Sequence, residues 1–284
     1  MKFVYSIIIF ISVIFLYSCS KLNEPIPAAP EITIHETGIL DKDSPNFHGT
    51  LVRENEWDLQ ICQGCHSADY SGGVAGSSCL TCHSKPEGPE ACNTCHGDFD
   101  NPDIIAPPRD INGNISTDST GVGAHFHHLY DNELGSEIEC STCHVVPEDY
   151  FDDGHVDTDL PAEVVLGNLA VHNIAGDASY DYSTATCSNT YCHGNWEFLK
   201  DSSDFQFMYT ADKMAGNNQS VIFNQVDGTQ ALCGSCHGLP PDGHLQSALS
   251  SCGLVGCHEG IVDSDGNIIN TEKHINGEKN VRGN

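Results

Sequence analysis

Apolar residues gather at one end of the chain. Residues 4–16 form an apolar run preceded by Lys2. Beyond that run, helical periodicity is short and scattered, and the intervening segments are rich in Gly, Asn, Asp, Ser and Pro, which favour turns. Residues 106–123 and 150–159 are predicted to be irregular. The pattern therefore predicts a few short helices in a mostly irregular chain.

The N-terminal run has the features of an export signal. It is too short to span a bilayer comfortably, and residues 1–18 are predicted to be a signal peptide. The sequence Leu16-Tyr17-Ser18-Cys19 resembles a bacterial lipobox, in which the cysteine is lipidated; a plain secretory signal is the alternative. Residues 19–30 would then be a flexible tether. We expect an exported protein, held by its lipid alone on the periplasmic or outer cell surface, or extracellular.

The remaining composition is unusual for a domain that folds by itself. The 284 residues include 40 acidic and 11 basic side chains, for a formal net charge of −29. Val, Ile, Leu and Phe make up only about a fifth of the residues after the signal, which is the border of intrinsic disorder. The acidic balance argues against nucleic acid as a partner and suits a basic partner or cations. Either the chain is largely unfolded, or something other than side chains supplies its core.

The cysteines resolve into a repeated motif. Without Cys19, fourteen cysteines form seven pairs, and a histidine directly follows each pair. Five pairs enclose two residues: Cys62 and Cys65 with His66, Cys79 and Cys82 with His83, Cys92 and Cys95 with His96, Cys140 and Cys143 with His144, and Cys233 and Cys236 with His237. Two pairs enclose four residues: Cys187 and Cys192 with His193, and Cys252 and Cys257 with His258.

The spacing C-x-x-C-H is the attachment signature of c-type haem. Each thiol adds to one of two vinyl groups on adjacent pyrrole rings, and the next side chain falls beneath the iron as its proximal ligand. Four intervening residues span the same points if the extra two bulge outward. Disulfides would give no reason for the histidines, and a histidine directly after the second cysteine is awkward for tetrahedral zinc. We therefore expect seven covalently attached haem c groups.

The remaining histidines are candidates for the distal ligands of the irons. Nine are left: His35, His48, His125, His127, His128, His155, His172, His244 and His274. Only Met208 and Met214 offer thioether alternatives in the mature chain, so methionine can serve at most two irons. On a helix His125 and His128 would share a face, whereas on a strand His125 and His127 would.

Four further stretches are distinctive: Ser44-Pro45-Asn46-Phe47-His48-Gly49, Ala124-His125 with His128-Leu129, Tyr191-Cys192-His193-Gly194, and Cys233-Gly234-Ser235-Cys236-His237-Gly238-Leu239-Pro240-Pro241 with Gly243-His244. Together with the motifs, they make the chain resemble bacterial multihaem c-type cytochromes that mix CxxCH and CxxxxCH motifs, from about residue 31 to 282. The resemblance implies seven distal ligands: His35, His48, His125, His128, His155, His244 and His274. It leaves out His127 and His172.

The expected fold is a multihaem cytochrome c with low β content, mostly irregular coil with short α-helices wrapped around a haem chain. Residues 31–284 would form one heptahaem domain. It would hold a trihaem cluster at 62–96, two spaced haems within 97–200 and a dihaem segment within 201–284. Residues 198–223, the longest stretch without a ligand, would hold a short hairpin or cover a haem face.

Two loops have oxygen ligands at calcium-loop spacing, at 110–114 and 262–267. The second lacks the distant bidentate glutamate, and a plain turn is the preferred interpretation of both.

The expected function is electron transfer rather than catalysis, with other redox proteins, or further copies of the chain, as partners. One alternative is a subunit of an extracellular haem filament, in which His35 could ligate a neighbour's haem. The other is a multihaem reductase of a nitrogen or sulfur oxyanion. A reductase needs an iron with an open position; the chain has no CxxCK motif, and its acidity would repel an anion.

Overall fold

The computed structural model describes residues 34–98, 101–107, 109–131, 133–254 and 256–281. The predicted signal peptide, the tether and Cys19 lie outside the described residues. The chain divides into two compact units, one up to Asn55 and one from Glu56, so a boundary falls inside the stretch expected to be one domain. Among the described residues, no helix combines the length and apolar character needed to cross a bilayer.

The first unit contains the helix α2 (His48–Glu54). Its start is fixed by His48, whose backbone N–H donates to the carbonyl of Ile39 at 2.8 Å. The Nδ1 atom of the same side chain contacts the same carbonyl at 3.0 Å. The Phe47 ring packs edge-on against the imidazole, with ring centroids 4.4 Å apart. These contacts hold the His48 ring in one orientation.

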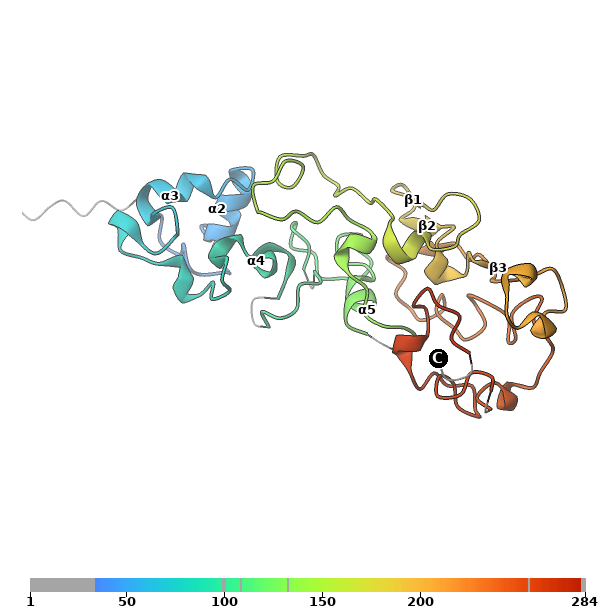
Figure 1. Ribbon diagram of the computed structural model, residues 1–284. Helices are drawn as coiled ribbons and strands as arrows, with labels where there is room; N and C mark the ends of the chain where they lie inside the picture. The colour runs from blue at the N-terminus through green and yellow to red at the C-terminus, as the bar shows by residue number, and fades with distance from the viewer. Residues whose placement is uncertain (1–33, 99–100, 108, 132, 255, 282–284) are drawn as a thin grey trace, which may run out of the picture. The chain divides into compact units, whose positions relative to one another are not determined.

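In the second unit the helices are short and coincide with ligand positions. The α-helices are α3 (Gln60–His66), α4 (Cys92–His96) and α5 (His125–Leu129), joined by long irregular segments (Figure 1). The 3-10 turns are η1 (Gly73–Ala75), η2 (Cys79–Thr81), η3 (Gly88–Glu90), η4 (Cys140–Thr142), η5 (Asn168–Val171), η6 (Tyr191–His193), η7 (Lys200–Ser202), η8 (Gln206–Met208), η9 (Leu249–Ser251) and η10 (Thr271–Lys273).

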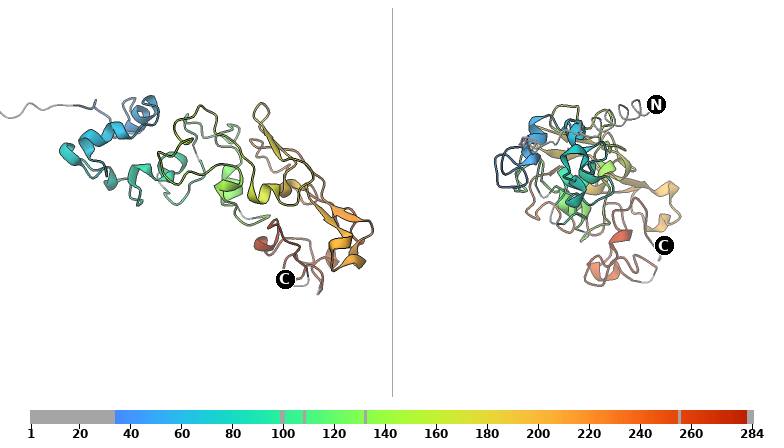
Figure 2. Two further views of the ribbon diagram at one scale, coloured as in Figure 1. Left: turned by 45° about the horizontal axis from the view of Figure 1, so that its top comes forward. Right: turned by 90° about the vertical axis from the view of Figure 1, so that its left-hand side faces the viewer.

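Two small antiparallel sheets complete the second unit, and Figure 2 shows them among the coil from two further sides. The three-stranded sheet has the order β1-β2-β5, formed by β1 (Ser179–Asp181), β2 (Thr186–Ser188) and β5 (Val221–Ile222). The second sheet pairs β3 (Glu197–Leu199) with β4 (Lys213–Ala215). In the first sheet Cys187 is registered against Tyr180 on one side and Val221 on the other.

The hydrophobic core among the described residues is thin. Eleven apolar residues are buried, four of them alanines, and no described large side chain is fully buried. Large apolar side chains such as Leu40 and Val74 are 81% and 89% exposed. Because hydrophobic stabilisation scales with the apolar area removed from water, side chains alone supply little of it here. The low content of helix and strand is the observed counterpart of the expected irregular chain.

Candidate haem-binding sites

Four of the five CxxCH motifs lie on helical turns. Those on α3 and α4 are α-helical, and η2 and η4 carry the first residues of two others. Because residues three apart share one face of a helix, both thiols of a motif project to the same side. All fourteen described cysteines are free thiols. Two thiols are therefore available at each motif for bonds to a single group.

The motif at 187–193 accommodates its two extra residues in a left-handed turn. Cys187 lies on β2 and the following Asn189 has a φ of 57°, after which η6 carries the second half of the motif. The Asn189 side chain donates to the carbonyl of Asp177 at 3.1 Å and accepts from Asn218 at 3.0 Å. In the motif at 252–258 the left-handed residue is Gly256, with a φ of 85°.

Five motif histidines each face one other histidine across a nearly constant distance. The ring centroids are 6.2 Å apart for His96 and His155, 6.2 Å for His125 and His144, 6.3 Å for His128 and His193, 6.2 Å for His237 and His274, and 6.5 Å for His244 and His258. In every pair one ring belongs to a motif and the other to the predicted distal set. The structure thus brings together five proximal and five distal candidates.

This distance suits an iron between two imidazoles. With metal–nitrogen bonds of roughly 2 Å on each side, as for histidine on other transition metals, the ring centroids of two axial imidazoles lie about 6 Å apart. The angles between the paired rings range from 24° to 81° while the distance hardly changes. If the rings packed directly against each other, the distance between their centroids would change with the angle between their planes. The nearly constant centroid distance therefore fits a group held between the two rings.

Most ligand candidates also have their second ring nitrogen fixed. In nine of them Nδ1 contacts a backbone carbonyl oxygen, and these are His48, His66, His125, His144, His155, His237, His244, His258 and His274. A carbonyl can only accept, so Nδ1 carries the proton and Nε2 keeps its lone pair for a metal. This is the second shell expected for a metal-binding imidazole.

The surroundings of three of the paired rings favour their neutral form. Burial lowers the pKa of His128 and of His193 to about 4. Burial also lowers the pKa of His125 to about 4, against a contact with the Val122 carbonyl that raises it. An uncharged imidazole is the form that binds a metal. These three rings are therefore in the form that a metal requires.

The environments of three buried thiols do not favour a thiolate site. Burial raises the pKa of Cys95 to about 11 and that of Cys192 to about 12. Burial and then the neighbouring Cys143 raise the pKa of Cys187 to about 11. Reactive thiolates and thiolate ligands need positive groups nearby, and none is among the causes of these shifts.

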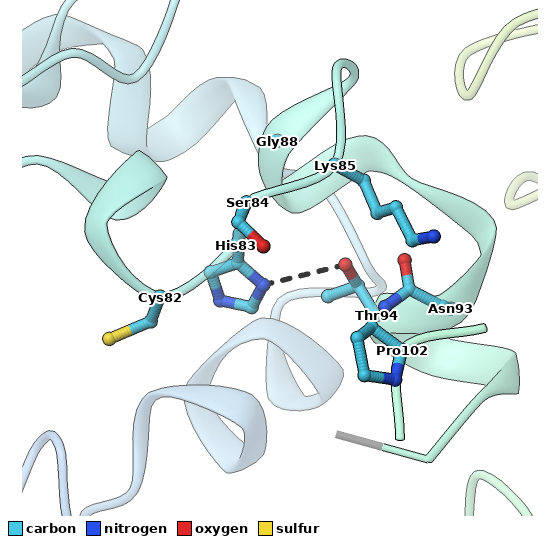
Figure 3. Close-up of a pocket in the computed structure, with 8 residues that line it drawn as sticks. All are labelled: Cys82, His83, Ser84, Lys85, Gly88, Asn93, Thr94 and Pro102. Carbon is cyan, nitrogen blue, oxygen red and sulfur yellow. Dashed lines mark hydrogen bonds between the residues drawn. The ribbon is translucent and has the colours of Figure 1, made fainter. Parts of the chain in front are cut away.

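The second and third motifs meet at a small cavity of about 130 Å³ (Figure 3). Cys82 and His83 line it from the second motif, and Asn93 and Thr94 line it from the third. The Thr94 hydroxyl lies 3.4 Å from Nδ1 of His83. The third motif therefore supplies a hydrogen-bond partner of the histidine of the preceding motif.

The two histidines that the resemblance leaves out have other contacts. Nδ1 of His127 lies 2.6 Å from a carboxylate oxygen of Asp131, one helical turn later on the exposed side of α5. Nε2 of His172 accepts from the Asn173 amide at 3.0 Å, and its ring lies edge-on to Tyr191. Neither is one of the five histidine pairs.

The remaining ligand candidates are divided between the two units. His35 and His48 lie in the first unit, and the motif residues His66 and His83 lie in the second. Like most of the other ligand candidates, His66 has its Nδ1 atom in contact with a backbone carbonyl, that of Ser77 at 2.9 Å. The assignment of His35 and His48 as distal ligands remains a prediction from the sequence.

Phe223 is a site residue that the sequence did not single out. Its ring lies edge-on to His125, with centroids 4.9 Å apart, and parallel to His128 at 6.0 Å. It comes at the end of the stretch expected to hold a hairpin or to cover a haem face. The sequence signal was therefore only the absence of ligands from residues 198–223.

The two candidate calcium loops use their carboxylates internally. In the second loop, Oδ1 of Asp263 accepts from the backbone N–H groups of Asp265 and Asn267, and Oδ2 accepts from the Asn267 amide. Asp110 accepts in the same pattern. Both loops are explained as turns. Within the described part of the chain, no group of three or more His, Cys, Asp or Glu side chains is placed to hold a metal ion.

Comparison with known proteins adds no further constraint. No family model, curated protein or solved structure matches the chain. The interpretation of the site rests on the motif spacing and on the geometry of the histidine pairs.

Proposed function

We propose that this protein is an exported multihaem c-type cytochrome that carries or conducts electrons through seven covalently attached, mainly bis-histidine haems. The observation that carries the proposal is the set of five histidine pairs at 6.2–6.5 Å, each containing the histidine of a cysteine motif. The proposal extends bis-histidine coordination to the motifs of His66 and His83, and His35 and His48 are the two members of the predicted distal set outside the five pairs.

The ligand arrangement favours electron transfer over catalysis. Haem supplies reversible one-electron exchange at its iron. Paired imidazoles such as His125 and His144 would occupy both axial positions and leave no place for a substrate. Their Nδ1 atoms are anchored to the carbonyls of Val122 and Glu163, so the rings would stay in place when the charge of the metal changes.

Contacts between successive motifs support a continuous path. Thr94 of the third motif contacts His83 of the second. Burial and then its neighbours His155, His125 and His144 lower the pKa of His96, which makes the third and fourth sites neighbours. Residues 217–219 link the fifth and sixth sites, because the backbone N–H of Asn217 donates to the carbonyl of Cys236 and that of Gln219 donates to the carbonyl of His193. Close spacing of this kind is what electron hopping between sites requires.

The thin core supports a cofactor that is part of the fold. Four of the eleven buried apolar residues are alanines, and leucines and valines elsewhere stand exposed. Covalently held macrocycles would cover such surfaces and supply the missing apolar area. Ligand binding and folding would then be one event, so the chain would not fold without haem.

The acidic surface bears on both potential and partner. A formal charge of −29 stabilises the more positive, ferric state of each iron and therefore lowers its reduction potential. It would also steer a basic redox partner toward the protein at low ionic strength.

Intact mass and reduced absorbance of the purified protein test the proposal. We expect a mass increase of seven haems and low-spin spectra in both oxidation states. Six haems or fewer would contradict the assignment of the CxxxxCH motifs as haem-attachment sites. Several high-spin haems would contradict bis-histidine ligation. A variant with Cys187→Ala and Cys192→Ala should carry one haem fewer, whereas a matched Ser188→Ala variant should keep all seven.

The anchor is tested separately. Cys19→Ala should abolish the mass of a lipid at the N-terminus and release the protein from membranes, whereas Ser20→Ala should change neither. Membrane retention by Cys19→Ala without lipid would overturn the proposed anchor while leaving the haem assignment untouched.

A further inference from the structure

The five histidine pairs fall into two groups by the angle between their rings. Three pairs are close to parallel, at 28° for His96 and His155, 24° for His125 and His144, and 35° for His244 and His258. Two pairs are crossed, at 81° for His128 and His193 and 70° for His237 and His274. The crossed pairs belong to consecutive motifs.

The ring orientations have identifiable causes around α5. His125 and His128 lie one turn apart on this helix, and both rings contact Phe223. The Phe223 ring is parallel to His128, at 8°, and perpendicular to His125, at 81°. It sits where a Cβ on Gly123 would lie 2.2 Å from it, so the ring fits closely against the start of the helix. Phe223 thus acts as a positioning residue for two ligands at once.

The angle between axial imidazoles changes the electronic state of a low-spin iron. Parallel rings remove the degeneracy of the two iron d orbitals that overlap with the ligand π systems, and this stabilises the ferric state. Crossed rings leave these orbitals close in energy, which gives a strongly anisotropic paramagnetic signal with one large g value. Crossed rings also favour the ferrous state, so the reduction potential rises.

Burial acts in the same direction at one of the crossed sites. His193 lies between Tyr191 and Asn195, which are 7% and 4% exposed. At the parallel site of His144, the next residues Val145 and Val146 are 64% and 50% exposed. Because a low-dielectric environment disfavours the additional charge of ferric iron, enclosure also raises the potential.

We propose that His128, His193 and Phe223 make the Cys187–Cys192 site the strongest electron acceptor of the five paired sites, with a crossed ligand set that it shares only with the neighbouring His237 site. This inference rests on the proposed function, since it requires a haem at each motif. It gives the chain a resting place for an electron between its two ends, rather than a uniform row of equivalent sites.

Electron paramagnetic resonance of the oxidised holoprotein tests the two classes. We expect at least two irons per protein in strongly anisotropic signals and at least three in rhombic signals. In a reductive potentiometric titration, an anisotropic component of one iron should disappear before any rhombic component of the five sites. The proposal is overturned if the anisotropic signals integrate to fewer than two irons, or if rhombic intensity is lost first.

Variants assign the signals to sites. His128→Met should remove one iron from the anisotropic intensity, whereas His125→Met, one helical turn away, should remove one iron from the rhombic intensity. The opposite result would overturn the assignment. Phe223→Leu keeps both ligands and should change the g values and the potential of the component that is reduced first. Phe207→Leu, at a residue that is 65% exposed in the same stretch, is the control and should change neither.

Haem content and spin state test the proposed function, whereas the resonance signals test the special role of the Cys187–Cys192 site. A protein without seven haems, or with several high-spin haems in its absorbance spectrum, contradicts the proposed function. Seven low-spin haems that give a single class of resonance signal, or unchanged spectra for Phe223→Leu, leave the proposed function standing and overturn the special role of this site.

Discussion

The predicted trihaem segment at 62–96 and the segment at 187–237 join their motifs by different means. In the trihaem segment a single buried residue, Tyr70, connects three motifs through its hydroxyl and its backbone carbonyl. In the later segment the backbone of one motif rests directly on the backbone of the next, at Gly194 and Cys236. The first arrangement tolerates different side-chain shapes around the connection, whereas the second depends on the absence of a side chain.

Tyr70 is 4% exposed and has bonds in three directions. Its hydroxyl donates to Glu90 at 2.6 Å and accepts from Gln63 at 3.0 Å, and its carbonyl accepts from the backbone N–H of Cys79. Burial and the hydrogen bond to Glu90 raise the pKa of Tyr70, so the hydroxyl keeps its proton. Gln63 lies within the first motif, Cys79 opens the second, and Glu90 lies two residues before the third.

In the later segment the backbones lie too close together for a connecting side chain at Gly194 or Gly216. A Cβ on Gly194, whose φ is 90°, would lie 2.0 Å from the carbonyl oxygen of Cys236. A Cβ on Gly216 would lie 2.2 Å from the carbonyl oxygen of Gly194. The backbone N–H of Asn217 donates to the Cys236 carbonyl at 2.8 Å. This close approach should make the segment the more sensitive of the two to small substitutions.

The largest expected effect is that of Gly194→Ala. The added methyl would clash with the carbonyl oxygen of Cys236, and alanine would have to adopt the left-handed backbone conformation of Gly194. Together these effects should lower the free energy of unfolding by about 3 kcal/mol. Thermal unfolding and the haem content of the holoprotein measure it. Gly234→Ala is the control, because its φ is 88° and its nearest neighbour would be 3.7 Å away. Equal effects of the two would remove the argument for a backbone contact.

Asn195→Ala should be the next most damaging change. The buried Asn195 amide donates to the carbonyls of Ala175 and Asn189 at 3.1 and 2.8 Å, and the loss of both part-buried hydrogen bonds costs about 2 kcal/mol. Asn217→Ala removes the same number of side-chain bonds, to Gly234 and Ser235, at an exposed position. Chemical denaturation should show the smaller loss for Asn217→Ala, and a reversed order would contradict the role of burial.

Tyr70→Phe tests how much the Tyr70 hydroxyl contributes to joining the motifs of the trihaem segment. It deletes the bonds to Glu90 and Gln63 but keeps the ring, so we expect a loss of about 1.5 kcal/mol with all seven haems retained. Thermal unfolding of the holoprotein measures the loss. Tyr180→Phe, at a partly buried tyrosine of β1, provides the comparison. If Tyr70→Phe destabilises the protein as much as Gly194→Ala, the two segments do not differ in their sensitivity to small substitutions.

Thr94→Ala should have the smallest effect. The contact of its hydroxyl with Nδ1 of His83 is long, at 3.4 Å, so its loss should cost less than about 1 kcal/mol and leave folding intact. The expected result is a small change in the midpoint potential of one site in a spectroelectrochemical titration. Thr94→Ser keeps the hydroxyl and should match the unsubstituted protein. A shift of equal size in both variants would exclude the hydroxyl as its cause.

Motif spacing predicted the local grouping of thiols and imidazoles, because that grouping depends on sequence alone. The spacing from Cys92 to His96 specifies two thiols and an imidazole on one short turn, whatever the rest of the chain does. The residues could not decide between a helix and a strand at 125–128. The structure has a helix, in which His125 and His128 each face a motif histidine while His127 contacts Asp131.

The pairings were beyond the sequence for a physical reason. His155 faces His96, a motif histidine that precedes the nearer motif of His144, and no periodicity encodes such a choice. The Nδ1 partners are backbone carbonyls, which every residue type offers equally. The close contact of Gly194 depends on tertiary packing, and a glycine after a motif has no distinguishing mark in the sequence.

Under the proposed coordination, each histidine pair is also a cross-link that closes a loop of chain. The closure between residues 96 and 155 contains the one between 125 and 144, and the closure between 128 and 193 interlocks with both. A second, nested set joins 237 to 274 around 244 to 258. None of these five closures passes across residues 194–236. The two sets of closures are therefore separate cross-linked regions of one chain. The backbone contact of Gly194 with Cys236 joins them at a place that none of the five closures spans.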